Sequence, residues 1–307
     1  MKIIVIGAGS IGRRHHDNLV HMGVDSHLVP WRAYRPEVLD GADAAVIATA
    51  TDVRLAPIRD AAERGLPLYI EKPMAFRPDD LDQITALMAP VADRSMLGLM
   101  MRYHPAFRVL ADLDLTETVR FSCDIGHDVT QWRANWRFSD SYAARADGGG
   151  VLLDLCHEID MAAVLFPGLT LGPVSCLGHP AYPGVDMSSR LMLTAANGAA
   201  GSVGMDYLTP KLHRRTILYG TRTMADFDFA AQRYTVTDAQ GARDIPITME
   251  RNEMFVGITR DWLALQQGQG ASNPLAPRLD RVDESTRLTA AAWAGRHFTG
   301  HITKEIP

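Results

Sequence analysis

The six residues GAGSIG at positions 7–12 constrain the fold of this chain more than any other stretch. They follow an apolar run, KIIVI at 2–6, and open a helical pattern that extends to about residue 22. In this context Gly7 permits a tight turn, Gly9 lets the backbone approach a pyrophosphate, and Gly12 packs helix against strand. The motif predicts a strand–turn–helix unit that binds a dinucleotide at the N-terminus of the helix. The alternative is a glycine-rich turn that binds no ligand.

The first hundred residues continue this alternation of strand and helix. Four further apolar runs are strand candidates, and two amphipathic stretches between them are helix candidates. The strand candidates lie at 26–29, 44–49, 67–70 and 95–100, and the helix candidates at 53–64 and 79–88. This order predicts a parallel sheet with helices on both faces. The segment after the second strand is too short for a full crossover helix, so we expect an irregular unit there.

The pattern changes beyond residue 118. A strand at 118–125 and a long polar loop at 126–147 precede a single predicted helix at 150–165. Short alternating runs from 172 to 248 are typical of an antiparallel sheet, and helical patterns return at 250–267 and 280–296. We therefore predict an α/β protein of two domains. The first is a dinucleotide-binding Rossmann domain (1–112), and the second is a substrate-binding and oligomerisation domain (113–307). The second has a large, mainly antiparallel open sheet, and its C-terminal helix can pack back on the first.

Composition excludes several classes of protein. A formal net charge of −5 and an isoelectric point near 6.1 argue against nucleic acid or an anionic membrane as the main partner. The first apolar run is too short for a signal peptide, and no stretch approaches the roughly 20 apolar residues of a membrane span. The three cysteines lack metal-ligand spacing and suit a reducing compartment. We expect a cytoplasmic protein without a metal.

The residues after the second strand bear on the choice of cofactor. An acidic side chain that binds the adenosine ribose is usual about 20 residues after the glycines, but this chain has Pro30, Trp31 and Arg32 there. A guanidinium suits a 2′-phosphate, so NADP(H) is favoured and NAD(H) remains possible. The alternative is that these residues only cover the shortened loop. The predicted cofactor-binding residues are Gly7, Gly9, Ser10, Ile11, Gly12, Trp31, Arg32, Thr49, Ala50, Thr51, Glu71, Lys72 and Pro73.

The sequence YIEKP at 69–73 places a lysine at the end of an apolar strand. In a doubly wound sheet, ligands bind beyond the carboxyl ends of the strands, so Lys72 is expected on the same rim as the glycine loop. An amine beside the nicotinamide can exchange a proton with a reacting hydroxyl. The alternative is a surface lysine that marks the end of a strand.

A second group of polar residues occurs in GGGVLLDLCHEID at 148–160. Asp154, His157 and Asp160 recur at intervals of three, so they form a stripe along one side of the predicted helix. An imidazole next to a carboxylate can handle protons or bind a metal. No other histidine or cysteine cluster supports zinc, which we discount. A solvated stripe or a helix–helix contact is the structural alternative.

Taken together, these motifs and RYHP at 102–105 resemble the glucose–fructose oxidoreductase / inositol dehydrogenase / MocA (Gfo/Idh/MocA) family over essentially the whole chain. The resemblance implies hydride transfer between NAD(P)(H) and a hydroxyl or keto group of a sugar, inositol or related compound. It implies that Lys72 is the catalytic lysine, that the Lys72–Pro73 bond can be cis, and that His157 touches the reacting hydroxyl. Asp154 completes the predicted catalytic set.

Three features depart from the family pattern. Asp154 and His157 are three residues apart instead of four, Arg54 replaces a family histidine, and the acid after the second strand is absent. Guanidinium groups suit anions and aromatic faces suit sugar rings. The predicted substrate-binding residues are therefore Arg102, Tyr103, His104, Trp132, Arg133, Tyr142, Asp154 and His157.

These inferences favour a dehydrogenase or reductase that acts on the CH–OH group of a sugar, inositol, sugar acid or nucleotide-sugar-type substrate. The alternatives are a catalytically silent dinucleotide and sugar sensor, and an imine or tetrapyrrole-type reductase on the same fold. We also expect a homodimer or homotetramer through an uncovered face of the second sheet. The residues expected on that face are Leu191, Leu193, Val203 and Met205.

Overall fold

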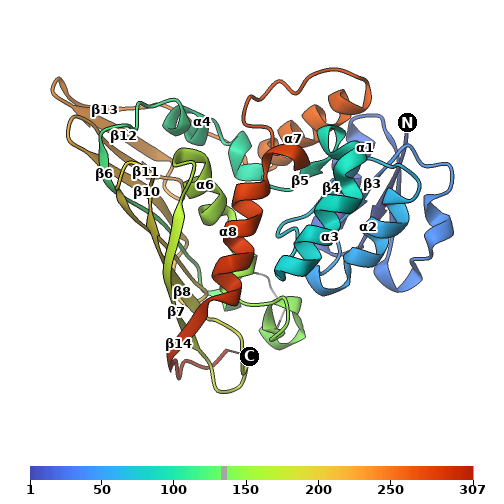
Figure 1. Cartoon of the computed structure of the whole chain (residues 1–307), viewed down its shortest axis with the longest axis horizontal. Helices are drawn as coiled ribbons and strands as arrows, with labels where there is room; N and C mark the ends of the chain where they lie inside the picture. Colours follow the sequence, from blue (N-terminus) through green and yellow to red (C-terminus); the bar gives the residue numbers. More distant parts are fainter. Residues whose placement is uncertain (133–136, 307) are drawn as a thin grey trace. The chain divides into compact units, whose positions relative to one another are not determined.

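The computed structural model describes residues 1–132 and 137–306 and divides them into two compact units (Figure 1). The first unit comprises Met1–His104 and Glu250–Thr286, and the second comprises Pro105–Met249 and Arg287–Pro307. We predicted a single boundary, at 112/113. In the structure, the first unit also includes Glu250–Thr286 from the C-terminal part of the chain. Within the described residues, no helix is both long and apolar enough to cross a membrane.

The first unit contains a five-stranded parallel sheet in the order β2-β1-β3-β4-β5. Its strands are β1 (Lys2–Ile6), β2 (Asp25–Val29), β3 (Ala44–Ile47), β4 (Leu68–Ile70) and β5 (Met96–Leu97). The central strands are apolar throughout because helices cover both faces of the sheet. The predicted Rossmann-like sheet is confirmed.

Helices lie on both faces of this sheet (Figure 1). They are α1 (Ser10–His21), α2 (Leu55–Ala62), α3 (Pro78–Met88) and α7 (Arg251–Gln266). Helix α1 connects β1 to β2, towards one edge of the sheet, whereas α2 and α3 connect β3 to β4 and β4 to β5, towards the other edge. Because parallel crossovers are right-handed, α1 covers one face of the sheet, and α2 and α3 cover the opposite face. Between β2 and β3 there are only two short 3₁₀ helices, Trp31–Ala33 and Pro36–Leu39, so the predicted irregular unit is confirmed.

Helix α7 belongs to the first unit because it completes that unit's core. Its Ile258 and Trp262 are fully buried and pack in one cluster with Ile3 and Val5 of β1 and Leu19 of α1. A sequence segment more than 200 residues from β1 therefore supplies part of the Rossmann core, as an apolar helix face requires a partner.

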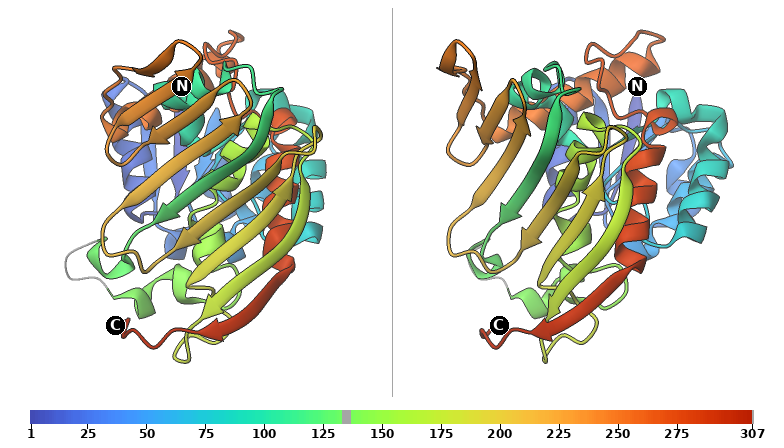
Figure 2. Two further views of the ribbon diagram at one scale, coloured as in Figure 1. Left: turned by 90° about the vertical axis from the view of Figure 1, so that its left-hand side faces the viewer. Right: turned by 60° about the vertical axis from the view of Figure 1, so that its left-hand side comes forward.

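The second unit is built on a nine-stranded sheet in the order β13-β12-β11-β10-β6-β9-β8-β7-β14 (Figure 2). Neighbours are antiparallel except for the β6–β9 and β7–β14 pairs, which are parallel. The strands are β6 (Thr118–Gly126), β7 (Thr170–Gly178), β8 (Ser188–Thr194), β9 (Ala200–Asp206), β10 (His213–Gly220), β11 (Met224–Asp228), β12 (Arg233–Asp238), β13 (Gly241–Asp244) and β14 (Arg296–His301).

Helices of the second unit pack behind this sheet, and in the described residues no helix crosses its other face (Figure 2). They are α4 (Pro105–Ala111), α5 (Val151–Asp154), α6 (His157–Leu165) and the later part of α8 (Asp283–Ala294). The predicted open sheet is confirmed, but the residues assigned to its open face were wrong. Leu191, Leu193, Val203 and Met205 are at most 2% exposed. They lie on the helix-covered face, because side chains alternate along a strand and apolar ones turn to the core.

Candidate active site

The glycine loop of the first unit is fixed tightly at two positions and left open at a third. Gly7 has a φ of +110°, and a Cβ there would lie 2.4 Å from the carbonyl oxygen of Ala48. A Cβ on Gly12 would lie 1.8 Å from the carbonyl oxygen of Gly7. A Cβ on Gly9, the N-cap of α1, would meet no atom within 4 Å, so the backbone is approachable there. This arrangement fits a pyrophosphate at the start of α1, where Ser10 and Ile11 form the first turn.

The end of β2 carries the side chains that were predicted to choose between NAD(H) and NADP(H). Arg32 is exposed, whereas the indole of Trp31 stacks on the ring of Tyr34 at 5.5 Å between centroids. The hydroxyl of Tyr34 donates to Asp60 at 2.8 Å, which holds the ring in place. Trp31 thus has one face occupied by a protein neighbour, and Arg32 is the cation at this position.

The EKP segment follows β4 at the carboxyl edge of the sheet. Lys72 is half-buried, and the peptide bond from Lys72 to Pro73 is cis. The carboxylate of Glu71 is buried, and its Oε1 lies 2.7 Å from Nε2 of His15 on α1. Burial favours a higher pKa for Glu71, but the hydrogen bond from His15 and the nearby charges of His15, Lys72 and Arg54 bring this pKa below its usual value. Glu71 therefore links the lysine segment to the helix of the glycine loop.

Arg54 gives this segment a second anchor. Its Nη2 donates to the carbonyl oxygen of Thr49 at 2.7 Å, and its Nη1 donates to the carbonyl oxygens of Glu71 and Pro73. The residue that stood out in the sequence only as a departure from the family thus contacts the backbone on both sides of Lys72. Two further predicted cofactor residues, Ala50 and Thr51, lead into the short 3₁₀ helix between Thr49 and Arg54.

The residues after β5 are engaged inside the first unit. Arg102 is buried, and its Nη2 donates to Oγ of Ser285 at 3.2 Å. The hydroxyl of Tyr103 donates to Oδ2 of Asp261 on α7 at 2.7 Å. Together with the buried His104, they form the connection between β5 and the end of this unit's first segment. That Arg102, Tyr103 and His104 bind the substrate remains a prediction.

In the second unit, Asp154 is held by two tyrosines. Its Oδ1 accepts from the hydroxyl of Tyr142 at 2.6 Å, and its Oδ2 accepts from the hydroxyl of Tyr207 at 3.0 Å. Burial and the Asp154 charge raise the pKa of Tyr207 well above its ordinary value, so this phenol remains a donor. Tyr207 follows β9 and nothing in its local sequence pointed to the site.

Three glycines place the segment that carries Asp154. Gly150 has a φ of +93°, and a Cβ there would lie 2.0 Å from Oδ1 of Asp186. The buried carboxylate of Asp186 accepts from the amide of Leu152 at 2.9 Å, the hydroxyl of Ser189 at 2.7 Å and Nη1 of Arg296 at 2.5 Å. Glycine is needed because the backbone approaches this buried ion pair closely.

The predicted single helix at 150–165 is wrong. Leu155 leaves the helical region with ψ of 28°, so Asp154 ends α5 and His157 begins α6. The expected stripe of Asp154, His157 and Asp160 on one helix therefore does not form, since a break separates the first residue from the other two. His157 and Asp160 are both buried, and the helix that carries them, α6, packs on β6 and β9 of the sheet.

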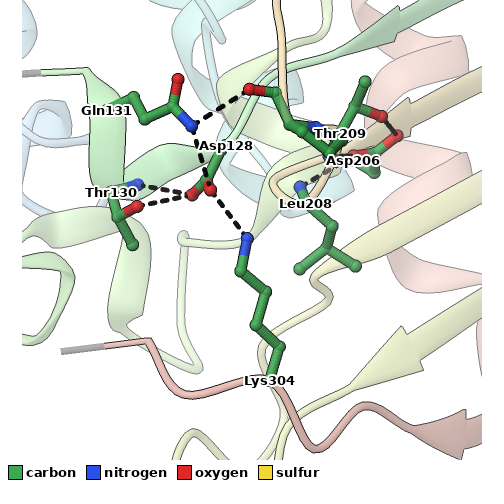
Figure 3. Close-up of polar contacts among 8 residues, drawn as sticks. Asp128, Thr130, Gln131, Asp206, Leu208, Thr209 and Lys304 are labelled. Carbon is green, nitrogen blue, oxygen red and sulfur yellow. Dashed lines mark hydrogen bonds and ion pairs between the residues drawn. The ribbon is translucent and has the colours of Figure 1, made fainter.

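The long loop is anchored next to this region by a polar network (Figure 3). Asp128 accepts from Thr130 and from the ammonium of Lys304 at 2.7 Å, so the C-terminal segment holds the start of the loop. Beyond it, Trp132 packs edge-on against Tyr207 at 5.5 Å between ring centroids. Of the predicted loop residues, Arg133 lies outside the described residues.

Within the described part of the chain, no group of three or more His, Cys, Asp or Glu side chains is arranged to hold a metal ion. The three cysteines are buried and reduced. The predicted site residues include an amine, an imidazole and carboxylates, which are groups able to transfer protons and to form hydrogen bonds.

Several solved structures resemble the whole chain at low sequence identity. KijD10, a 3-ketoreductase from Actinomadura kijaniata in complex with NADP and TDP-benzene, has a TM-score of 0.77 at 16% identity, with 99% of each chain covered. UDP-N-acetylglucosamine 3-dehydrogenase GnnA from Acidithiobacillus ferrooxidans gives 0.76 at 18% identity, with 96% of each covered. Levoglucosan dehydrogenase in complex with NADH gives 0.75 at 18% identity, with 96% of each covered. This likeness confirms the fold class.

The sequence comparison supplies the family. No protein in a search of curated sequences matches. Residues 105–226 match the family model of the GFO/IDH/MocA C-terminal domain, and this match begins at the first residue of the second unit. The family resemblance predicted from the sequence is confirmed for this part of the chain, which is similar to the C-terminal domain of the GFO/IDH/MocA family.

Proposed function

We propose that this protein is an NAD(P)(H)-dependent oxidoreductase that acts on a secondary alcohol or ketone of a nucleotide-sugar-type substrate. The observation that carries the proposal is the position of Lys72. It follows β4 at the carboxyl edge of a parallel sheet, the edge that also bears the glycine loop after β1. Ligands of doubly wound sheets bind at this edge.

The open glycine loop at Gly9 supports dinucleotide binding by the first unit, and similar structures contain NADH or NADP. Bound nicotinamide would supply the hydride donor or acceptor. Lys72 would give a proton to the forming alkoxide in reduction and remove one from the hydroxyl in oxidation. In the second unit, His157 is assigned to the substrate hydroxyl, and Asp154, fixed by two tyrosines, to the same polar group.

The nucleotide-sugar class is supported by two structural relatives. GnnA is a UDP-N-acetylglucosamine dehydrogenase, and KijD10 was crystallised with a TDP compound. A screen of sugars, inositols, sugar acids and nucleotide sugars, read as absorbance of NADPH at 340 nm, tests the class. We expect turnover with a nucleotide sugar or its keto form. Tight NADP(H) binding without turnover of any compound would favour a silent sensor instead.

Lys72→Met tests the role of the lysine because it removes the proton and charge while keeping a long side chain. Turnover should fall on the order of 10²–10⁴-fold, whereas affinity for NADP(H) should persist. Lys211→Met, outside the glycine-loop unit, is the matched control. If Lys72→Met retained turnover within about threefold of the wild type, Lys72 would not be the proton-transfer group.

Cofactor preference is a separate part of the proposal. The exposed Arg32 after β2 favours a 2′-phosphate, so NADP(H) should bind more tightly than NAD(H). Arg32→Ala should reduce that preference about tenfold or more, because a hydrogen bond to a charged group contributes about 1.5–3 kcal/mol. Equal affinity of the wild type for both dinucleotides, measured by calorimetric titration, would contradict this part.

For assembly, we propose a homodimer through the open face of the nine-stranded sheet. Paired residues on five neighbouring strands form one row across this face. The charges in the row alternate in sign, with an uncharged glycine in second place: Arg190, Gly204, Asp124, Arg215 and Asp228. A two-fold axis can place such a row against itself with opposite charges facing. Met192→Arg should then yield monomers by light scattering, whereas Val20→Arg in the first unit should not. A monomeric wild type would refute this.

A further inference from the structure

We propose that Arg54 is a positioning residue for Lys72. The guanidinium bridges the ends of two strands by donating to the carbonyl of Thr49 after β3 and to the carbonyls of Glu71 and Pro73 after β4. The last two residues flank the lysine directly. Arg54 therefore fixes the backbone on both sides of Lys72, so that its side chain leaves from a defined point. This inference rests on the proposed role of Lys72.

The burial of Arg54 supports a dedicated role. Arg54 is only 3% exposed, although arginine is one of the residue types least often buried. The guanidinium donates to three main-chain oxygens, and its charge interacts with the buried carboxylate of Glu71. A planar group with several fixed donors can hold three carbonyls at once, whereas an ammonium presents all its donors from one atom.

Two residues from different elements contact the lysine segment. His15 of α1 contacts the Glu71 side chain, and Arg54, which immediately precedes α2, contacts the backbone of the same segment. The first contact connects Lys72 to the helix of the glycine loop. The second connects it to the strand end at Thr49, which lies between β1 and β4 in the sheet. The arginine thus fixes the lysine relative to the edge where the dinucleotide is proposed to bind.

Arg54→Met, which preserves length and removes the donors, tests the proposal. We expect kcat to fall on the order of 10–10²-fold, since small displacements of a catalytic group have effects of this size. NADP(H) affinity should remain within about threefold, as measured by calorimetry. Arg54→Lys, which keeps the charge, should lose less than Arg54→Met and provides a second variant if the first folds poorly. Arg59→Met, an exposed arginine of α2, is the matched control and should leave kcat unchanged.

A double-mutant cycle separates positioning from a general loss of structure. If Arg54 acts through Lys72, then Arg54→Met should reduce kcat by less than about threefold in the Lys72→Met background. If the two effects multiply instead, Arg54 does not act through the lysine and the proposal is overturned.

Amide hydrogen exchange of the peptide that spans 71–76 provides a readout that needs no substrate. Exchange there should be about tenfold faster in Arg54→Met than in Arg59→Met, with the amides of β1 unchanged. Unchanged exchange at 71–76 would overturn the proposal whatever the enzyme does. Faster exchange together with a wild type that turns over nothing would instead leave the ordering by Arg54 established and refute the proposed function.

Discussion

Replacing Asp186 by asparagine should destabilise the second unit strongly, because it breaks a buried ion pair. The carboxylate is 0% exposed and accepts from Arg296, whose side chain is also largely buried. Asparagine keeps the size and can still accept from the amide of Leu152 and the hydroxyl of Ser189, so the change isolates the charge. Leaving one partner of a buried pair uncompensated costs about 3–5 kcal/mol of unfolding free energy.

Urea titration followed by circular dichroism and tryptophan fluorescence measures this loss. Arg296→Met should cost a similar amount, because it leaves the Asp186 carboxylate without its cation and removes the guanidinium that lies 4.2 Å from the centroid of the Trp293 ring. In the double variant neither charge is stranded, so its cost should be at least about 2 kcal/mol less than the sum of the single costs.

A surface pair is the matched control for Asp186→Asn. Asp238 pairs with Arg243, whose side chain is 56% exposed, so Asp238→Asn should change the unfolding free energy far less than Asp186→Asn. If Asp186→Asn were as mild as this control, or if the two single effects simply added, the buried ion pair would not be what stabilises the second unit.

Three further outcomes are expected. Tyr207→Phe should lower the unfolding free energy by about 1.5–3 kcal/mol, because Asp154 loses a buried donor, and urea titration measures the change. Burial raises the pKa of Asp128, but hydrogen bonds from Lys304 and Thr130 lower it. The pKa of this carboxyl therefore lies below its usual value. Its contribution to stability is therefore present above the unfolded-state pKa and lost as the pH falls, so Lys304→Met should flatten the acid side of a stability–pH curve. Trp262→Ala should cost about 3–5 kcal/mol, because the indole is fully buried, and a smaller cost would show that α7 is not part of the first unit's core.

The sequence by itself determined the Rossmann-like sheet because local patterns encode it. Apolar runs such as KIIVI specify strands, and amphipathic stretches between them specify helices, whatever lies elsewhere in the chain. The glycine spacing at 7–12 is equally local, because each glycine is required by the geometry of the same short turn. The edge that bears Lys72 follows from the parallel order of the strands and could also be predicted.

Other predictions failed or were incomplete because they depend on which residues meet across the fold. Alternation in β8 and β9 shows that the strands have two different faces, but only the helices packed on the sheet decide that Leu191 and Val203 face inward. A continuous helical pattern at 150–165 gave no sign of the break after Asp154, whose carboxylate is held by tyrosines from distant segments.

The anchors of the candidate site were decided by tertiary structure alone. Arg54 is unusual in the sequence only by comparison with a family pattern, and its contacts with the backbone on both sides of Lys72 exist because β3 and β4 lie side by side. Asp186 and Arg296 are 110 residues apart and form a pair only when β14 joins the sheet beside β7. A hydrogen bond depends on distance in space, and sequence patterns record distance along the chain, so local reasoning could propose candidate reactive groups but not the residues that hold them.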